Sequence, residues 1–426
     1  MNEVNRPEIV IIPLAGKARV EGPSEMDFLV RLTVPEVPIS SERTRLNLGL
    51  VLDRSGSMSG RKLKYAKKAA CYCVDQLLPE DLVSIVIFDN EVEVLVPPVS
   101  GNERNKIKKT IGSVRSGGST ALYAAWVTGG KQVAENLDPK YVNRIILLTD
   151  GLANEGVTNT EVFVSRAEGL FNRGISTTTI GVGNDFNEDL LVAMARAAGG
   201  NSWFVEGPED FQRIFETEMG GLLREVCTRV SLGIDPADGV EILDVLNDFD
   251  RTSTGKYRLP NLLAGESLDV LVRVRLPGGP GGRAPAFKAV VGWTSQGSEE
   301  RRYAEEEAFI AYVSADEART QENHQEVVKI RQLLGAARAR RQAMVEMDAG
   351  DYAGAKNIIH RWAQSSKELF NAMPDQDLEI DSRELSCLLQ EIEDNKNLKS
   401  TRKRMMYESL YRQRSRKNSP PKKEKP

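Results

Sequence analysis

The sequence predicts an α/β fold in which a doubly wound parallel sheet is inserted in a β-sandwich and followed by a C-terminal helical region. Three observations support this fold class. Residues 45–220 alternate between apolar runs of strand length and segments with helical periodicity. On both sides of this region, apolar residues recur at every second position, which is typical of half-exposed strands. From residue 315 onward the periodicity is helical.

Residues 43–221 are expected to form the α/β domain. Between its first two apolar runs, residues 62–78 have apolar side chains at three- and four-residue spacing, and the lysines lie largely off that stripe. We therefore expect the lysines on a solvated helix face. Strands that are apolar throughout and separated by helices imply a parallel sheet covered on both faces. The four expected strands are Leu46–Leu52, Leu82–Phe88, Ile145–Leu148 and Ser176–Val182.

Residues 1–42 and 222–314 are expected to form one antiparallel β-sandwich that the α/β domain interrupts. Phe28, Val30, Leu32 and Val34 alternate with other residues, as do the apolar residues of 268–276. An N-terminal strand without a partner would expose its edge and its apolar face, so it should pair with the distant strands. Such an insertion is tolerated because the termini of a domain tend to lie close together.

Residues 315–412 are expected to be helical. Gly350 stands where a C-terminal cap is expected, and Asp351 where the next helix would have its N-cap. Residues 413–426 are expected to be a disordered basic tail. The three expected helices are Gln325–Ala349, Asp351–Phe370 and Asp381–Arg412.

Charge is distributed unevenly along the 426 residues. Residues 401–426 contain ten Lys and Arg against two Glu, a local charge of +8, so the remaining 400 residues carry −12. Neither a secretory signal nor an apolar run of membrane-spanning length is apparent. Four scattered cysteines do not suggest a disulfide framework. The expected compartment is the cytoplasm.

Asp53-Arg-Ser55-Gly-Ser57 follows the first apolar run. The carboxyl end of a strand in an open α/β sheet is where ligands bind. One carboxylate and two hydroxyls are hard oxygen donors that suit Mg²⁺ or Mn²⁺. Asp, Ser and Gly are also ordinary turn residues, so this motif alone leaves both interpretations open.

Two more segments favour the metal site. Thr120 stands in a glycine-rich loop that opens a helical segment, and Asp150 ends an apolar strand before a Gly turn. With spacings of 67 and 97 residues from Asp53, this order closely resembles the von Willebrand factor A family and its metal-ion-dependent adhesion site.

The resemblance implies a complete ligand set. Ser55, Ser57 and Thr120 would present hydroxyls to Mg²⁺ (or Mn²⁺ or Ca²⁺), and Asp53 and Asp150 would bind mostly through water. An acidic side chain from a partner protein would complete the coordination.

Further similarity, in residues 179–191 and 197–205, is to bacterial stand-alone members of this family. By analogy with those members, an AAA-type ATPase of the MoxR kind is a possible partner.

Enzyme activity is not expected. Residues 112–119 have the spacing of a phosphate-binding loop, but Gly118 stands where the lysine is required. Ser55 occupies the position at which aspartyl phosphatases generally have a second acid. His324 and His360 lie far in sequence from the metal motif, so no general base is apparent.

The sequence therefore predicts a metal-dependent protein-binding scaffold or adaptor. The alternative is a metal-independent interaction protein that binds nucleic acid or acidic surfaces through residues 401–426. Such binding by the tail would be weak and non-specific.

Overall fold

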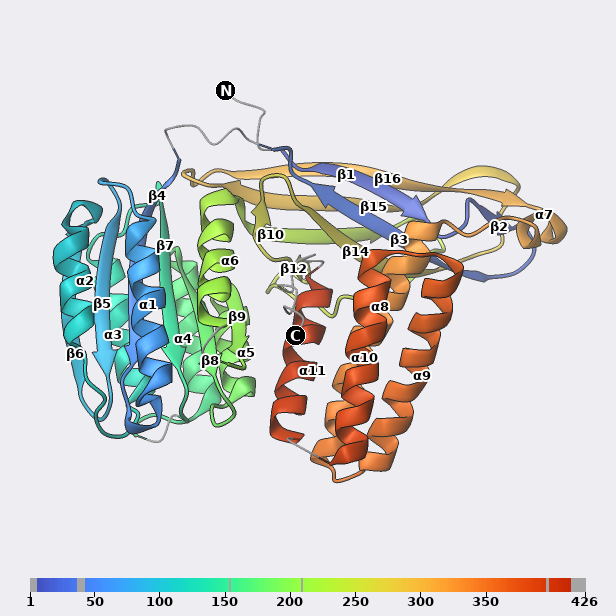
Figure 1. Cartoon of the computed structure of the whole chain (residues 1–426). Helices are drawn as coiled ribbons and strands as arrows, with labels where there is room; N and C mark the ends of the chain where they lie inside the picture. Colours follow the sequence, from blue (N-terminus) through green and yellow to red (C-terminus); the bar gives the residue numbers. More distant parts are fainter. Residues whose placement is uncertain (1–5, 37–42, 153–154, 208–209, 396–397, 415–426) are drawn as a thin grey trace. The chain divides into compact units, whose positions relative to one another are not determined.

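The computed structural model describes residues 6–36, 43–152, 155–207, 210–395 and 398–414. They form two compact units, whose elements are labelled in Figure 1. One unit contains the described residues between 43 and 225, with the short segment 296–299. The other contains residues 6–36, residues 226–295 and the described residues from 300 onward. Over the described residues, no helix has the length and apolar character that crossing a membrane requires.

The first unit is built on a six-stranded sheet with the order β6-β5-β4-β7-β8-β9. The predicted parallel arrangement is confirmed for β4, β5, β7 and β8. Strand β9 was not among the predicted strands, and it pairs parallel with β8. The edge strand β6 was not predicted, and it pairs antiparallel with β5. The strands are β4 (Arg45–Asp53), β5 (Leu82–Phe88), β6 (Val92–Ser100), β7 (Tyr141–Thr149), β8 (Ile175–Val182) and β9 (Gly199–Val205).

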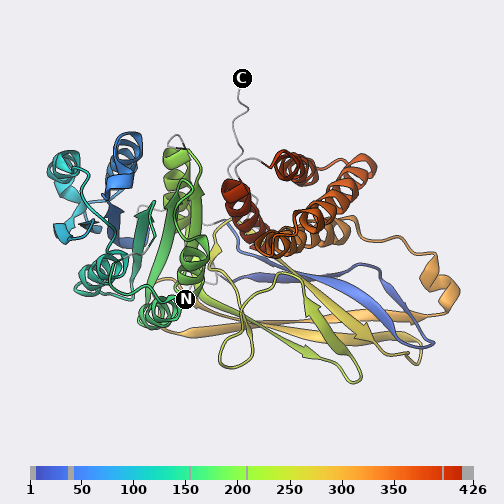
Figure 2. The same cartoon turned by 90° about the horizontal axis from the view of Figure 1, so that it is seen from below.

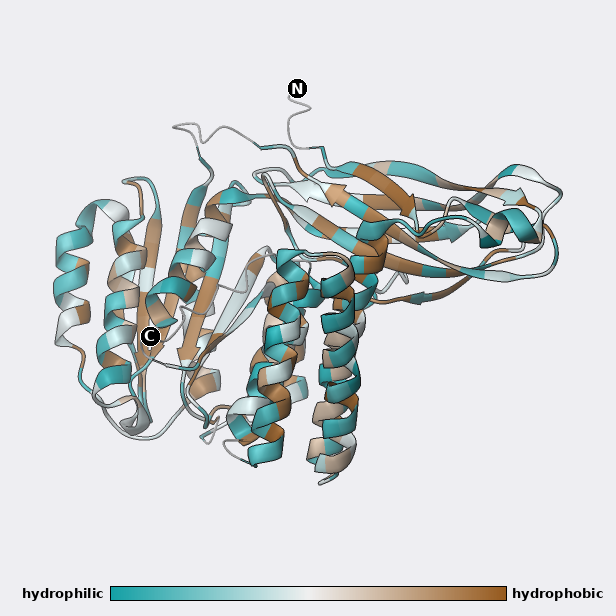
Figure 3. Cartoon of the chain, turned by 45° about the vertical axis from the view of Figure 1, so that its right-hand side comes forward, coloured by the Kyte–Doolittle hydropathy of each residue, from teal (hydrophilic) through white to brown (hydrophobic). Residues whose placement is uncertain are grey.

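Helices cover both faces of this sheet (Figure 2). Helix α1 contacts both α2 and α6, whereas α4 packs against α5. On α3, Gly129 allows close packing, because a Cβ there would lie 2.4 Å from the Val51 side chain. In Figure 3, brown strands lie between helices whose outward sides are teal, as expected for a doubly wound domain. The helices are α1 (Arg61–Asp75), α2 (Arg104–Ser113), α3 (Leu122–Ala134), α4 (Thr160–Asn172), α5 (Glu188–Ala197) and α6 (Asp210–Arg224), with 3-10 turns at Gly56–Met58 and Gly101–Glu103.

The second unit contains the β-sandwich. Its first sheet has the order β1-β3-β14-β11, and β3 pairs with β14 over ten residues, from Ser24↔Leu276 to Thr33↔Ser267. Its second sheet has the order β12-β10-β15-β16-β2, with β13 paired to β10. Between the sheets, Phe28 and Phe287 pack edge to face at 5.2 Å. The strands are β1 (Glu8–Pro13), β2 (Lys17–Arg19), β3 (Ser24–Thr33), β10 (Glu225–Pro236), β11 (Glu241–Val245), β12 (Tyr257–Arg258), β13 (Leu262–Leu263), β14 (Ser267–Leu276), β15 (Gly282–Ser295) and β16 (Arg301–Val313).

The helical region follows the sandwich as α7 (Ala315–Arg319), α8 (Gln325–Asp348), α9 (Tyr352–Ala372), α10 (Gln376–Asp394) and α11 (Leu398–Gln413). The expected caps are present, since Gly350 has a φ of 83° and the Asp351 side chain accepts from the backbone N of Gly354. The single helix expected over 381–412 is wrong. The chain leaves the helical conformation at Asn395, which has a φ of 50°, so α10 and α11 are separate.

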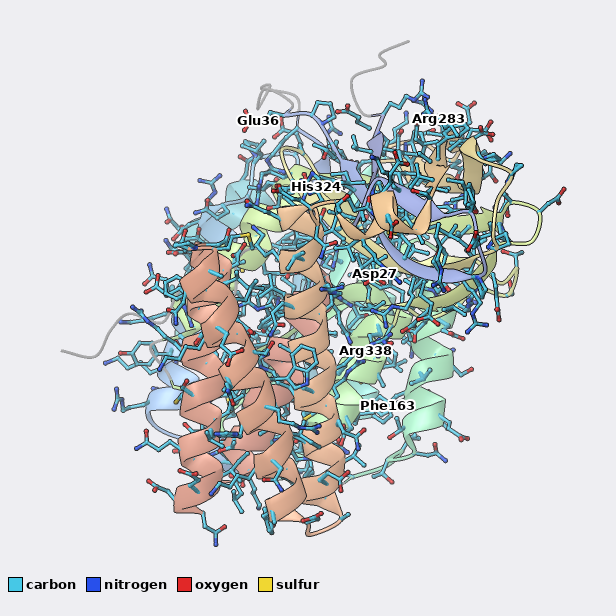
Figure 4. The ribbon with its side chains drawn as sticks, turned by 90° about the vertical axis from the view of Figure 1, so that its right-hand side faces the viewer. Asp27, Glu36, Phe163, Arg283, His324 and Arg338 are labelled. Atoms are coloured by element: carbon cyan, nitrogen blue, oxygen red, sulfur yellow. The ribbon has the colours of Figure 1, made fainter. Side chains whose placement is uncertain are left out.

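Helix α8 packs on the sandwich through Val327 and Leu334, which join a buried cluster with Leu29 and Leu271. Figure 4 shows His324 at the start of α8 and Arg338 farther along the same helix. Arg338 forms ion pairs with Asp244 and Asp248, at 2.5 Å each. The helix is therefore attached to the sandwich by both apolar packing and ion pairs.

The basic residues near the C-terminus are partly a structural feature of the helical region. Arg402 and Arg404 lie in α11 and pair with Asp348 at 2.8 Å and with Glu391 at 2.6 Å. Within residues 401–426, which were considered for binding acidic surfaces, the charges of Arg402 and Arg404 are therefore paired inside the fold. The remainder of the predicted tail, residues 415–426, lies outside the described residues.

Candidate metal centre

Asp53 ends β4 and is fully buried. One of its carboxylate oxygens accepts from the backbone N of Ser55 at 2.8 Å. The other accepts from the hydroxyl of Thr149 at 2.6 Å. Both oxygens are therefore fixed by neutral donors, one from its own loop and one from the end of the neighbouring strand β7.

Ser55, Ser57 and Asp150 lie together beside this carboxylate. The 3-10 turn at Gly56–Met58 folds the loop back, so that the hydroxyls of Ser55 and Ser57 lie 3.1 Å apart. The Ser57 hydroxyl donates to Oδ1 of Asp150 at 2.7 Å. Strands β4 and β7 are parallel neighbours, which brings Asp53 and the buried Asp150 to the same edge of the sheet.

Thr120 reaches the same place from a third segment. Its glycine-rich loop is attached to the first loop by two backbone hydrogen bonds, from Gly56 N to Gly118 O at 2.9 Å and from Gly117 N to Arg54 O at 2.7 Å. Thr120 is buried, and a Cβ built on Gly151 would lie 2.9 Å from its hydroxyl. The structure thus brings all five candidate ligands to the carboxyl edge of the sheet.

Asp89, which the sequence analysis did not single out, holds the Thr120 loop in place. Its side chain accepts from Gly118 N at 3.3 Å and forms an ion pair with Arg54 at 3.2 Å. Its carbonyl accepts from the backbone N of Ala121 at 2.8 Å. Gly117 must lack a side chain, because a Cβ there would lie 1.7 Å from the Asp89 carboxylate. An acid directly after an apolar strand was the signal for this residue, as it was for Asp150.

Lys62 was expected on a solvated helix face, but the structure places it at the site. Its Nζ lies 2.5 Å from Oδ2 of Asp150, and its side chain is only 28% exposed. The ammonium reaches the carboxylate because Lys62 stands in the first turn of α1, directly after the loop that carries Ser55 and Ser57. Asp150 is consequently shared between a hydroxyl and a cation.

The electrostatics of the site favour a bound cation. Burial raises the pKa of Asp53 to about 6, and the nearby Asp150 carboxylate adds to this shift against the hydrogen bonds from Thr149 and Ser55. Buried carboxylates of like charge are stabilised in their ionised form by a cation. Among the described residues, no three His, Cys, Asp or Glu side chains form a metal-binding cluster. A metal here would depend on the hydroxyls, which fits hard cations such as Mg²⁺.

The fold and these donors define a class of protein, namely one with a doubly wound α/β domain that has an oxygen-rich site at the carboxyl edge of its sheet. Residues 47–217 match the model of the von Willebrand factor type A domain. The chain therefore contains a domain of this family, as the resemblance of the motifs predicted.

Several curated proteins are similar to the chain. The uncharacterized protein YfbK of Escherichia coli (strain K12) is 28% identical over 198 residues, which are 46% of this chain and 34% of YfbK. The uncharacterized protein sll0103 of Synechocystis is 24% identical over 353 residues, covering 76% of this chain and 79% of that protein. Human inter-alpha-trypsin inhibitor heavy chain H4 is 30% identical over 36% of this chain and 17% of its own length. The match to YfbK thus spans only about a third of that relative.

Two solved structures resemble nearly the whole chain. The von Willebrand factor type A protein from Catenulispora acidiphila has a TM-score of 0.70 at 16% identity, and covers 97% of this chain and 98% of its own. The ArnB paralog VWA2 from Sulfolobus acidocaldarius has a TM-score of 0.62 at 17% identity, with coverages of 96% and 98%. At these identities the likeness shows the fold, which extends beyond the α/β domain to its flanking regions.

Proposed function

We propose that the chain is a divalent-metal-dependent protein-binding scaffold or adaptor that docks an acidic side chain of a partner. The observation that carries this proposal is the convergence of two buried carboxylates and three hydroxyls from three separate loops. Lys62 balances the charge of Asp150 only, so burying both carboxylates in their ionised form is unfavourable. A dication would remove that cost.

Each residue has a defined task in this proposal. The hydroxyls of Ser55, Ser57 and Thr120 would hold Mg²⁺, Mn²⁺ or Ca²⁺, and Asp53 and Asp150 would supply negative charge around it. The bound ion would supply a docking point for a carboxylate of the partner. Carboxylates are preferred ligands of these cations, and a charge-assisted contact at a buried site is strong.

The remaining chemistry of the chain supports binding and not catalysis. The sequence contains two histidines, and both lie in the other unit, His324 at the start of α8 and His360 on α9. A hydrolytic reaction at the site would need a general base beside it. All four cysteines have free thiols, which supports a reducing compartment such as the cytoplasm.

The test is capture of partners from the native cell extract with the purified chain in Mg²⁺ and in EDTA. Asp53→Asn removes a negative charge from the site and Thr120→Val removes a hydroxyl ligand, and both keep the size of the side chain. Asp138→Asn, on the loop before the opposite end of β7, makes the same change as Asp53→Asn away from the site. We expect both ligand variants and EDTA to reduce partner binding by about tenfold or more, on the order of 1.4 kcal/mol.

Asp138→Asn should retain the partners that the wild type binds. Mass spectrometry of the captured fraction identifies the partners, and it tests whether a MoxR-type ATPase is one of them. Full retention of every partner by Asp53→Asn, with its fold intact by circular dichroism, would show that the partners do not dock through the metal centre.

A further inference from the structure

A groove of about 670 Å³ lies beside the candidate metal centre, between α1, the end of α2 with the segment after it, and the start of α6. Figure 1 shows α1 between the other two helices, in agreement with its contacts. The interior of the groove is apolar, with contributions from Leu63, Ile111, Val114 and Phe211. This surface is not used by the candidate metal ligands.

The groove and the metal centre are continuous along the chain. Gly60, at one end of the groove, directly follows the loop with Ser55 and Ser57. Arg115 and Ser116 directly precede Gly117, whose backbone N is hydrogen-bonded to the carbonyl of Arg54. A partner bound at the metal centre would therefore also contact the adjacent groove.

The charge of the groove is positive. Lys64, Lys67, Lys68 and Arg115 line it, and the one acidic residue among its lining, Asp75, pairs with Lys108 at 2.7 Å. In the part of the chain that the structure describes, neither Lys64 nor Arg115 forms an ion pair, and both side chains are exposed. They are therefore available to a ligand from outside.

The other two cations help to shape the groove. Lys67 donates to the carbonyls of Gly112 and Val114 at 2.7 and 3.0 Å, which connects α1 to the end of α2 and to the segment after it. The Nζ of Lys68 lies over the ring of Tyr65, 5.3 Å from its centroid. The groove thus combines a fixed apolar interior with exposed cations at its rim, Lys64, Lys68 and Arg115.

We propose that this groove binds an acidic peptide segment of the partner whose carboxylate docks at the metal centre. The inference rests on the proposed function, and it names the second contact of the same partner. Acidic side chains of the segment pair with Lys64 and Arg115, and apolar side chains between them contact Leu63 and Val114. The positive charge of the groove favours an acidic segment. Its apolar interior favours a peptide, which has apolar side chains, over a nucleic acid.

The length of the segment follows from the geometry of α1. Its 15 residues span about 22 Å at a rise of 1.5 Å per residue. An extended peptide advances about 3.3 Å per residue, so roughly seven residues reach from one end of the helix to the other. The probe is therefore a fluorescein-labelled peptide of about this length with alternating acidic and apolar residues, and its counterpart has amides in place of the carboxylates.

Fluorescence anisotropy of the full chain tests the proposal. We expect Lys64→Glu combined with Arg115→Glu to weaken binding of the acidic peptide by about tenfold, in Mg²⁺ and in EDTA alike. Asp53→Asn should weaken it in Mg²⁺ only, down to the level seen in EDTA. The control combines Lys131→Glu and Lys140→Glu, which change the net charge equally on exposed residues outside the groove. It should alter binding by less than about twofold.

The outcomes separate this proposal from the proposed function. Metal-dependent binding that is insensitive to the Lys64 and Arg115 changes would overturn the groove while leaving the metal site intact. Binding that depends on the groove but is indifferent to EDTA and to Asp53→Asn would support the groove and contradict the proposed function. The groove proposal also fails if no acidic peptide binds, if the amide counterpart binds equally well, or if a single-stranded oligonucleotide binds more tightly. Should the double charge reversal unfold the chain, Lys64→Gln with Arg115→Gln provides the same test without added negative charge.

Discussion

Asp150 and Asp53 have different electrostatic surroundings although they lie at the same edge of the sheet. Asp150 has the ammonium of Lys62 at 2.5 Å, which balances its charge. The hydrogen bonds to Asp53 come from a backbone N–H and a hydroxyl, both neutral. The pair therefore retains an uncompensated negative charge when both acids are ionised, and a dication supplies the missing compensation.

Metal should accordingly stabilise the native state. A ligand that binds only the folded protein raises the free energy of unfolding by about 2.7 kcal/mol when its free concentration is a hundredfold above Kd. We expect millimolar Mg²⁺ or Mn²⁺ to raise the Tm of the wild type, measured by calorimetry, and to have little effect on Asp53→Asn. If none of the divalent cations shifts the Tm or gives a binding isotherm, these oxygens do not form a metal site.

Lys62 should weaken metal binding, because its ammonium already interacts with the carboxylate that the metal needs. The substitution Lys62→Met removes this positive charge and should raise the affinity for Mg²⁺ or Mn²⁺ by up to about tenfold, equivalent to ~1.4 kcal/mol. Isothermal titration calorimetry measures this directly. Lys64→Met, two residues along the same helix and exposed, is the matched control. Weaker metal binding by Lys62→Met would instead mean that the lysine orients Asp150 for the metal.

The raised pKa of Asp53 predicts a pH dependence in the absence of metal. Because burial raises the pKa of Asp53 to about 6 from its ordinary value of 3.8, the folded state holds the proton more tightly than the unfolded state does. Ionised Asp53 therefore destabilises the fold above pH 6, by on the order of 3 kcal/mol, and this cost disappears as the pH falls toward 4.

The measurement is urea unfolding in EDTA at several pH values for the wild type and for Asp53→Asn, whose side chain stays neutral. The wild type should gain stability relative to this variant as the pH falls from 7 to about 4. A relative loss of stability over that range would mean that the folded protein stabilises the ionised form of Asp53.

At the scale of single residues, sequence reasoning could select the five candidate ligands because each lies in or beside a glycine-containing loop next to an apolar strand or helix. It placed Lys62 wrongly. Helical periodicity says which face of a helix is apolar, but not that the first turn of this helix points its lysine at a carboxylate from another strand. Asp89 was missed because it stabilises a loop that is 28 residues or more away in sequence. Its carboxylate accepts a hydrogen bond from the backbone N of Gly118 in that loop.

Among the elements, the unpredicted ones lack strong local signals. Strand β6 lies at an edge of the sheet and contains Pro97 and Pro98, which weaken a strand pattern but are tolerated at an edge. The break between α10 and α11 contains neither Gly nor Pro that would have marked it in the sequence. Asn395 adopts the left-handed conformation there instead. Local propensity therefore predicts the central strands well and the boundaries set by tertiary packing poorly.

The attachment of α8 to the sandwich should depend on Arg338. Its guanidinium bonds to both carboxylate oxygens of Asp244 and of Asp248. Arg338→Met leaves these acids without that partner, and we expect a loss of about 1–3 kcal/mol in urea unfolding. Arg383→Met is the control, because Arg383 is 69% exposed and pairs with Glu379 on its own helix. The Arg383→Met substitution should lower the free energy of unfolding by about 0.5 kcal/mol or less. Equal effects of the two substitutions would show that the Arg338 ion pairs contribute no more than a surface pair.

At the scale of the whole molecule, the sandwich joins segments that are more than 200 residues apart. Strand β3 lies between β1 and β14, and its ten-residue register with β14 links the start of the chain to residues 267–276. The two-residue alternation predicted that these segments belong to one sandwich, since their apolar faces need a common core. It could not predict which strands are neighbours, because many pairings bury the same alternating faces.

A chain that starts at Arg43 should therefore fail to fold its sandwich. It lacks β1 and β3, and with them Phe28, Val30 and Leu32, which are fully buried in the common core. Each buried side chain of this kind contributes about 1.5–3 kcal/mol, which together approaches the stability of a typical domain. Strand β14 would also lose the neighbour with which it forms ten residue pairs, and its exposed edge and apolar face would promote association.

We expect aggregation in size-exclusion chromatography and rapid proteolysis of residues 226–313. Residues 43–225 alone, which form the other unit, are the control and should remain monomeric. A monomeric Arg43 truncation with the protease resistance of the full chain would show that the sandwich does not need its N-terminal strands.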